Sequence, residues 1–365
     1  MKKTVIALAI AAMAATSANA ATVYEQDGTK VELGGSLRIF LGKNANKLGG
    51  DSAAALHTGN SQQRGDLIND GSRVTLKVSH KLSDDVKAFV GYELRFKAKD
   101  NVTTNEDGSD SEFGGVQTKK LYGGFDFANV GAVSFGRQAT TADDVVGDSL
   151  YFRSGLLNPL TTGADKSVKF RSAEFAGFSF GVDYLFGHAK KYDGNDYKNG
   201  YQAGLFYNYE IAENHAVDFA AVYAVDQYDD KTTSDTVLKK HQWAVATHYK
   251  LDGLQLGAAY GQIYNRYQES GLLDTKGQYV FVEAKYNLKD VTGIPTTFGL
   301  QWERLSEKAD TADAPSVIKN QYIAVVDYKF NKNVLPYVQY ARASLKDVNE
   351  RRAENVYGVG LRVYF

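Results

Sequence analysis

Apolar and polar residues alternate over long stretches of this sequence, and that alternation constrains the fold more than any other feature. From Val31 to Leu41 every second residue is apolar or glycine, while Glu32, Ser36 and Arg38 lie between them. Because side chains point alternately to the two faces of a strand, a period of two predicts a β-strand with one apolar face. This stretch exceeds the usual five or six residues and suits a tilted membrane-spanning strand of about 9–11 residues.

The same alternation recurs to the end of the chain and predicts sixteen antiparallel strands, an even number as in bacterial single-chain transmembrane barrels. The predicted strands are 30–42, 71–82, 86–97, 116–127, 132–138, 166–172, 177–187, 200–210, 215–226, 240–250, 254–265, 277–288, 296–305, 318–330, 334–344 and 354–365.

The connections between these strands alternate strictly between short and long. The short ones lie at 83–85, 129–131, 174–176, 212–214, 252–253, 290–293 and 331–333, and most are rich in turn-forming residues. The long ones lie at 43–70, 98–115, 139–165, 188–199, 227–239, 266–276, 306–317 and 345–353. This arrangement places all short turns at one rim and all long loops at the other. It is typical of outer-membrane barrels, with short periplasmic turns and long extracellular loops.

The chemistry of the two faces indicates which one meets lipid. In the strand near 277–288, Val280, Val282 and Ala284 share one face, and Glu283 and Lys285 share the other. A Lys or Arg facing lipid at mid-bilayer costs about 2–4 kcal/mol, so the charged face must point inward. Backbone groups at an open sheet edge would be unpaired in lipid, so the sheet must close. The sequence predicts an all-β, 16-stranded transmembrane barrel around a water-filled lumen.

The first twenty residues are predicted to be a cleaved signal peptide. Lys2 and Lys3 precede an apolar run from Val5 to Ala15, which is too short to span a bilayer, and Ala18-Asn19-Ala20 forms a cleavage site. Residues 21–365 would then form a single barrel domain.

Aromatic residues are predicted to face outward near the strand ends, where they suit the two interfacial girdles of a membrane barrel. They are Tyr92, Phe96, Tyr184, Phe186, Tyr209, Tyr249, Tyr286, Trp302, Tyr328, Phe330 and Tyr340.

Composition argues against several other classes of protein. Without Lys2 and Lys3 the 42 basic residues fall to 40, against 43 acidic ones, so the net charge of −3 does not suit nucleic-acid binding. The chain has no cysteine, and its six histidines lie in no G-x-S-x-G or zinc-ligand context. We therefore expect no enzyme activity, no metal and no cofactor.

Several short motifs, in order and spacing, resemble those of Gram-negative general porins. They are the segment from Ala21 to Val31, Gly71-Ser72-Arg73, Leu121-Tyr122-Gly123-Gly124-Phe125, the segment from Val133 to Gln138, and the ending from Val359 to Phe365. The branch that the chain most resembles is the Pasteurellaceae-type major porins. The resemblance implies a homotrimer in outer-membrane lipid and lipopolysaccharide that passes small hydrophilic solutes and ions. It also implies that the barrel-assembly machinery reads Phe365.

The resemblance further implies a pore that is narrowest beside the third long loop, 139–165, where loop acids oppose basic residues of the wall. The acidic candidates are Asp143, Asp144 and Asp148, and the inward-facing basic candidates are Arg38, Arg73, Arg95, Lys120, Lys169 and Arg171. Two features depart from the family pattern. Lys120 stands where arginine is common, and the segment from Leu150 to Gly155 replaces the family's Pro-Glu-Phe-Gly-Gly.

Three alternatives to a general pore remain open at this point. A sugar-selective channel would need a file of inward aromatics, and Tyr151 and Phe152 could begin one, whereas Phe40, Phe89 and Phe281 are scattered. A barrel enzyme would need an acid–base–nucleophile constellation. A structural or adhesive barrel would conduct no ions.

Overall fold

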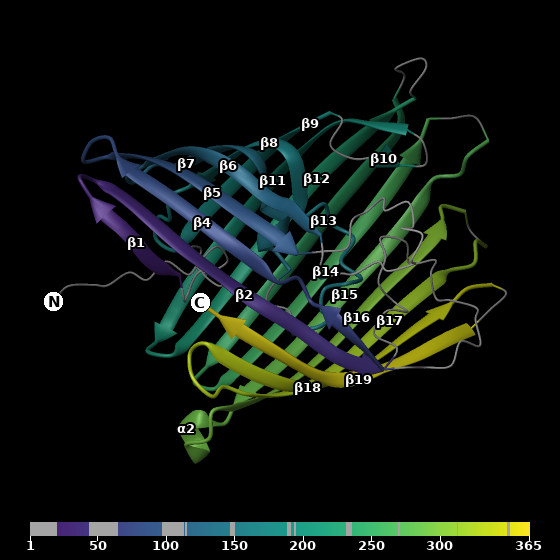
Figure 1. Cartoon of the computed structure of the whole chain (residues 1–365). Helices are drawn as coiled ribbons and strands as arrows, with labels where there is room; N and C mark the ends of the chain where they lie inside the picture. Colours follow the sequence, from purple (N-terminus) through teal and green to yellow (C-terminus); the bar gives the residue numbers. More distant parts are fainter. Residues whose placement is uncertain are drawn as a thin grey trace, which may run out of the picture.

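The computed structural model describes residues 20–43, 65–96, 113, 115–146, 150–187, 191–192, 195–230, 236–268, 271–311, 313–348 and 351–365. Its strands form one antiparallel sheet whose members tilt around a common axis (Figure 1). They are β1 (Ala21–Gln26), β2 (Thr29–Lys43), β3 (Gly65–Asn69), β4 (Arg73–Lys81), β5 (Val86–Phe96), β6 (Val116–Phe127), β7 (Gly131–Ala139), β8 (Gly163–Ser172), β9 (Phe178–Phe186), β10 (Lys191–Tyr192), β11 (Asn195–Ala212), β12 (His215–Asp229), β13 (Thr236–Leu251), β14 (Leu254–Tyr267), β15 (Thr275–Asn287), β16 (Thr296–Ala309), β17 (Val317–Tyr328), β18 (Val334–Lys346) and β19 (Arg351–Tyr364).

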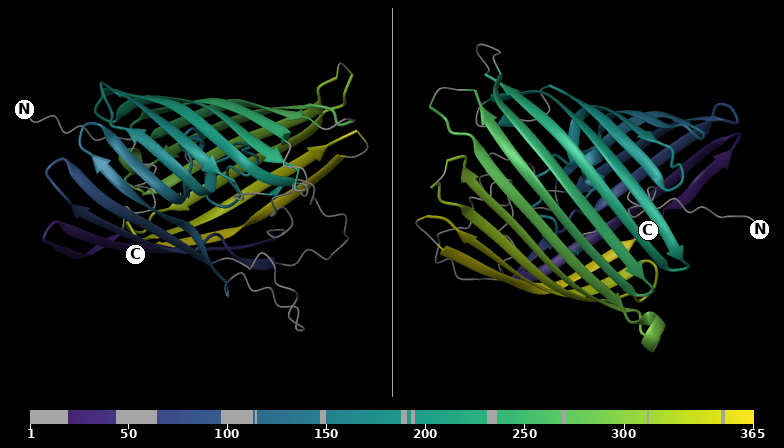
Figure 2. Two further views of the ribbon diagram at one scale, coloured as in Figure 1. Left: turned by 90° about the horizontal axis from the view of Figure 1, so that it is seen from above. Right: turned by 180° about the vertical axis from the view of Figure 1, so that it is seen from behind.

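The sheet closes on itself because the last strand pairs with an early one. β19 runs antiparallel to β2 from Tyr357 opposite Lys43 to Tyr364 opposite Ser36. The Phe365 N–H donates to the Gly35 carbonyl at 3.1 Å and the Gly35 N–H to the Phe365 carbonyl at 2.9 Å, so the seam is bonded to the final residue. With β3 and β4 counted as one interrupted strand, and the short β1 and β10 left out, the barrel has the sixteen strands predicted. Figure 2 shows the closed wall from two further sides.

Burial along the strands inverts the pattern of a water-soluble protein. In β9 the exposed face consists of Phe178, Phe180, Val182, Tyr184 and Phe186, and the alternate residues, which include a serine and an aspartate, are buried. An apolar exposed face fits a surface that contacts lipid, and the polar face lines the inside of the barrel. Among the described residues, no helix has the length and apolar character needed to cross a bilayer.

The short connections form tight turns where the sequence predicts them. Asn129, Asn214 and Asp252 adopt positive φ angles of 61°, 58° and 46°, a region that Asn and Asp enter more readily than most residues. The turn predicted at 290–293 instead contains a short helix, α2 (Lys289–Thr292), which Gly293 ends at a φ of 73°.

The fold prediction is confirmed, and the predicted strands coincide with the main strands of the barrel to within a few residues at most ends. Three strands were not predicted: β1, which forms a hairpin with β2, and β3 and β10, which lie inside predicted long loops. β3 pairs with the loop end of β2, and the irregular segment Asp70–Ser72, where Gly71 has a φ of 74°, separates it from β4. Residues 1–19 of the predicted signal peptide lie outside the described part of the chain.

Candidate functional site

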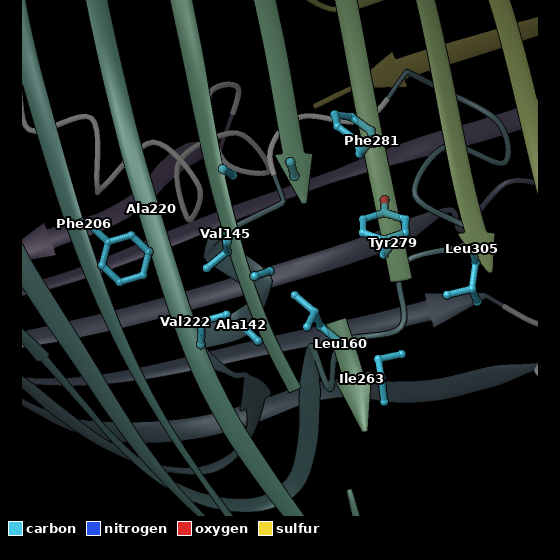
Figure 3. Close-up of a cluster of buried hydrophobic side chains, with 13 residues drawn as sticks. Ala142, Val145, Leu160, Phe206, Ala220, Val222, Ile263, Tyr279, Phe281 and Leu305 are labelled. Carbon is cyan, nitrogen blue, oxygen red and sulfur yellow. The ribbon is translucent and has the colours of Figure 1, made fainter. Parts of the chain in front are cut away.

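The described part of the third long loop lies inside the barrel, packed on the inner wall. Ala142, Val145 and Leu160 of this loop contact buried side chains of the wall, including Phe206 on β11 and Tyr279 on β15. Figure 3 shows these loop and wall residues converging in the barrel interior. Apolar side chains thus anchor the loop where the rest of the inner wall is largely polar.

Side-chain acceptors of the wall also hold the backbone of this loop. The N–H groups of Gly155 and Leu157 both donate to the Glu303 carboxylate, at 2.7 and 2.9 Å. The Thr161 N–H donates to Gln242 at 2.9 Å, and the Gln339 amide both accepts from and donates to the backbone of Phe152. Because buried amides need acceptors, inward-facing Glu and Gln residues determine where the loop can rest.

The start of the loop is fixed in the same way. A short 3₁₀ helix, η3 (Thr141–Asp144), follows β7, and its first N–H donates to the buried Asp183 carboxylate on β9. The Ala142 N–H donates to Gln202 on β11 at 2.9 Å. These contacts leave Asp143 and Asp144 at the end of η3.

Two aromatic residues of the loop are stacked against the wall. The Phe152 ring lies 4.4 Å from the Phe40 ring, and the Tyr151 ring lies 4.4 Å from the Tyr337 ring, measured between centroids. The Tyr151 hydroxyl donates to the Asp327 carboxylate. Burial, followed by the effect of this carboxylate, raises the pKa of the Tyr151 phenol far above its usual range, so the hydroxyl stays neutral and acts as a donor.

Asp144 forms ion pairs with two of the predicted basic residues. Its Oδ2 lies 3.2 Å from Arg171 Nη1 and 3.4 Å from Lys169 Nζ, both on β8. The Arg171 guanidinium also lies 3.6 Å from the centroid of the Phe206 ring, which restricts its position. Asp143 interacts electrostatically with Lys120 and Lys169.

The other predicted basic residues gather separately, around two carboxylates of the wall. Glu93 accepts from Arg95 at 2.6 Å and lies 3.3 Å from Arg73, and Asp70 lies 2.9 Å from Arg362. An open cavity of about 400 Å³ adjoins this group. It is lined by Arg38, Asn69, Asp70, Gly71, Arg73, Arg95, Phe96, Tyr151, Phe152 and Arg362.

Sequence reasoning missed several residues of this region. Lys119 lies in a β-bulge, where Glu93 opposes Lys120 and Leu94 opposes Thr118. It interacts electrostatically with Arg95 and Asp143.

Arg362 was also missed. It has inward parity, yet it lies in the last strand, far in sequence from the other arginines. Recurrent Gln and Glu at inward positions, such as Gln301 and Glu303, were the available signal for the loop anchors. The predicted Asp148 lies outside the described residues.

These features define a class of protein: a closed transmembrane barrel with an apolar outer face, a polar interior and a third long loop folded inward. Sixteen strands enclose an aqueous channel rather than a filled core.

Comparisons with known proteins agree with this class. Residues 7–348 match the model of a family described as Gram-negative porin. The chain is 37% identical to the major outer membrane protein of Pasteurella multocida strain Pm70 over 386 aligned residues, with full coverage of both chains. The chain therefore belongs to the Gram-negative porin family, and it is a general diffusion channel of the outer membrane.

Two solved structures share the fold at low sequence identity. The outer membrane channel DcaP of Acinetobacter baumannii matches with a TM-score of 0.71 and 16% identity, covering 94% of this chain and all of that one. In-vitro folded OmpT of Vibrio cholerae, in a trimer form, matches with a TM-score of 0.64 and 18% identity over 94% and 100% of the two chains.

Proposed function

We propose that Asp143, Asp144 and Asp148 of the third loop oppose a basic wall at the narrowest part of the pore and create a field across it. The observation that supports this proposal is that Arg38, Arg73 and Arg95 line an open cavity of about 400 Å³, separate from Asp143 and Asp144 on the inward-folded loop. Arg171 and Lys169, which lie 3.2 and 3.4 Å from Asp144, hold this carboxylate in place. The remaining basic residues, Arg38, Arg73, Arg95 and Lys120, would extend the positive side along β2, β4, β5 and β6.

The physical basis is electrostatic screening. At physiological salt, charges are screened over about 8 Å, which is comparable to the radius of a narrow pore. Charges at a constriction therefore act on every passing ion, whereas charges in the wide vestibules are largely screened. Segregated charges would orient dipolar solutes and separate the paths of anions and cations.

The structure offers little support for a sugar-selective aromatic slide. Phe152 is 8% exposed and Phe40 is fully buried, and the two stack on each other. Tyr151 is stacked on Tyr337 and bonded to Asp327. A stacking platform for sugars needs ring faces open to the lumen, and these faces are occupied.

Liposome swelling with sugars of graded size tests the general pore against a selective one. We expect the swelling rate to fall smoothly with sugar size, with no saturation for any one sugar, because Phe40, Tyr151 and Phe152 are already stacked. Stereoisomers of equal mass are the control. A rate that saturates for a single isomer would support a selective channel instead.

We also propose that the protein assembles as a homotrimer. The family resemblance supports this, as does the trimer form of the OmpT structure that shares its fold. Native mass spectrometry in mild detergent should show a trimer that dissociates on heating, and a species that is only monomeric would contradict the proposal.

Phe365 is proposed as the residue that the assembly machinery recognises. Its two backbone hydrogen bonds with Gly35 close the seam, and its ring lies over Gly35, where an added Cβ would come within 2.5 Å of Phe365 Cζ. Deleting Phe365 should lower the outer-membrane level several-fold, because the seam loses both bonds and the terminal aromatic. Phe365→Tyr is the control, and quantitative immunoblotting of membrane fractions is the measurement. Unchanged levels after deletion would refute this role.

The chain is proposed to act as a channel only, without catalysis. Among the described residues, no group of three His, Cys, Asp or Glu side chains is arranged to hold a metal ion.

Residues 1–20 are proposed to be removed during export. Mass measurement of the mature protein from outer membranes tests the cleavage site after Ala20.

A further inference from the structure

Strands from near the two ends of the chain meet at the seam, where β19 pairs with β2. β18, β19 and β2 lie side by side there (Figure 1). β19 pairs with β2 over eight residues, from Tyr357 to Tyr364. This pairing closes a loop that contains almost the whole chain, and the entropy cost of closure grows with loop length. Contacts that stabilise the seam beyond its backbone pairing therefore matter for the closed barrel.

Two aromatic rings of the wall cover the seam from the inside. Gly360 on β19 is directly opposite both Tyr337 on β18 and Phe40 on β2. Since Gly360 has no side chain, the two rings extend toward each other over it, with centroids 6.3 Å apart and planes that differ by 23°. A Cβ added at Gly360 would overlap the Tyr337 ring. The rings thus stack although their own strands are about 9.5 Å apart.

The third loop adds a second layer of rings on this pair. Phe152 stacks on Phe40 and Tyr151 stacks on Tyr337, each at 4.4 Å between centroids, with interplanar angles of 14° and 26°. We call these four residues the seam cluster. Phe40, Phe152 and Tyr337 are all buried, so the loop covers the rings that lie over the seam.

Polar contacts attach the same two loop residues to the strands at the seam. The Gln339 side chain on β18 bonds the backbone of Phe152 as both donor and acceptor. The Arg362 guanidinium on β19 lies 4.7 Å from the centroid of the Tyr151 ring and pairs with Asp70, which follows β3, at 2.9 Å. Two adjacent loop residues therefore contact β2, β18 and β19.

We propose that the third loop has a second role, which is to hold the barrel closed at its seam. Stacked aromatic pairs stabilise by more than the area they bury. With Tyr151 and Phe152 in place, separating β2 from β19 breaks the seam cluster as well as the backbone hydrogen bonds. Docking of the loop and closure of the barrel therefore stabilise each other. This role depends on rings and is independent of the charged constriction.

Hydrogen–deuterium exchange of the folded protein in detergent micelles, read by mass spectrometry, tests this role. The variant is Tyr151→Ala with Phe152→Ala. The control is Val145→Ala with Leu160→Ala, which truncates two apolar residues of the same loop that pack with wall residues of β11–β16 instead. Each lost ring pair is equivalent to about twofold to tenfold in the opening equilibrium, so seam amides of β2 and β19 should exchange on the order of tenfold faster in the variant. In the control they should exchange as in the wild type.

A disulfide across the seam separates loss of closure from a general loss of stability. Leu41 and Val359 oppose each other on the exposed outer face, and the chain has no cysteine of its own. Residues in such a pair have Cα atoms about 5.5 Å apart, which suits a disulfide. Adding Leu41→Cys and Val359→Cys to the variant should restore slow exchange at the seam when the bridge is oxidised and not when it is reduced. Folding of the variant only in the oxidised form would equally support the role.

Two results would overturn the proposal. One is exchange at the wild-type rate in β2 and β19 of the variant without the bridge. The other is equal acceleration in the control, which would show that the loop stabilises the barrel as a whole and not its seam. Neither measurement involves ion passage, so a failure here is distinguishable from a failure of the proposed constriction.

Discussion

Replacing Glu303 by alanine is expected to release the third loop from the wall, lower the mean single-channel conductance and add rapid partial closures. The Glu303 carboxylate is fully buried and accepts the N–H groups of Gly155 and Leu157 at 2.7 and 2.9 Å. Each buried N–H left without an acceptor costs about 1–3 kcal/mol. A loop freed from the wall can move only toward the lumen, so the current should fall and become noisier.

Two variants show whether the effect comes from the loop. Glu303→Gln keeps a carbonyl acceptor and should behave more like the wild type. Glu307→Ala removes a carboxylate from the same face of β16 that pairs with Lys319 at 3.0 Å rather than with the loop. Steady current at wild-type conductance in Glu303→Ala, or equal noise in Glu307→Ala, would show that Glu303 does not hold the loop.

Opposite changes of charge on the two sides of the proposed constriction are expected to shift the reversal potential in opposite directions. The double variant Arg38→Gln and Arg95→Gln removes two positive charges and keeps the Arg73–Glu93 ion pair, which is 3.3 Å long. Keeping that pair avoids leaving Glu93 as an uncompensated buried charge. Under a salt gradient, its reversal potential should move toward cation preference. Asp143→Asn with Asp144→Asn should move it toward anion preference.

Both shifts should shrink as salt rises, because the screening length falls from about 30 Å at 0.01 M to about 3 Å at 1 M. Lys250→Gln, at the turn rim, serves as a control for a charge far from the loop. Wild-type reversal potentials in both double variants at low salt would mean that these residues do not line the narrowest part of the pore.

The strands were predictable because the signal for each is local. Apolar and polar side chains alternate along Val31–Leu41, and Val282 and Glu283 alternate in the same way, because each strand contacts lipid on one face and water on the other. β3 was not predictable in this way, since Gly65–Asn69 is short and its pairing with Ile39–Lys43 of β2 depends on a chain segment more than 20 residues away.

The position of the third loop depends on contacts that no local pattern encodes. Inward parity identifies Gln301, Glu303 and Gln339 as lumen residues. Their hydrogen bonds to Ser154, Leu157 and Phe152 of the loop span sequence separations of 146 to 187 residues. Parity likewise identifies Arg38, Lys169 and Arg171 as inward, and it does not say which of them meets Asp144. A bulge removes Lys119 from the alternation altogether.

Single-channel recording of the purified protein in a planar lipid bilayer tests the central claim most directly. A water-filled pore predicts stepwise increases of current whose size is nearly proportional to the conductivity of the bulk salt solution. Added sugars should not block this current in a saturable way. Insertion of correctly folded protein without conductance steps would contradict the claim and would favour a structural barrel.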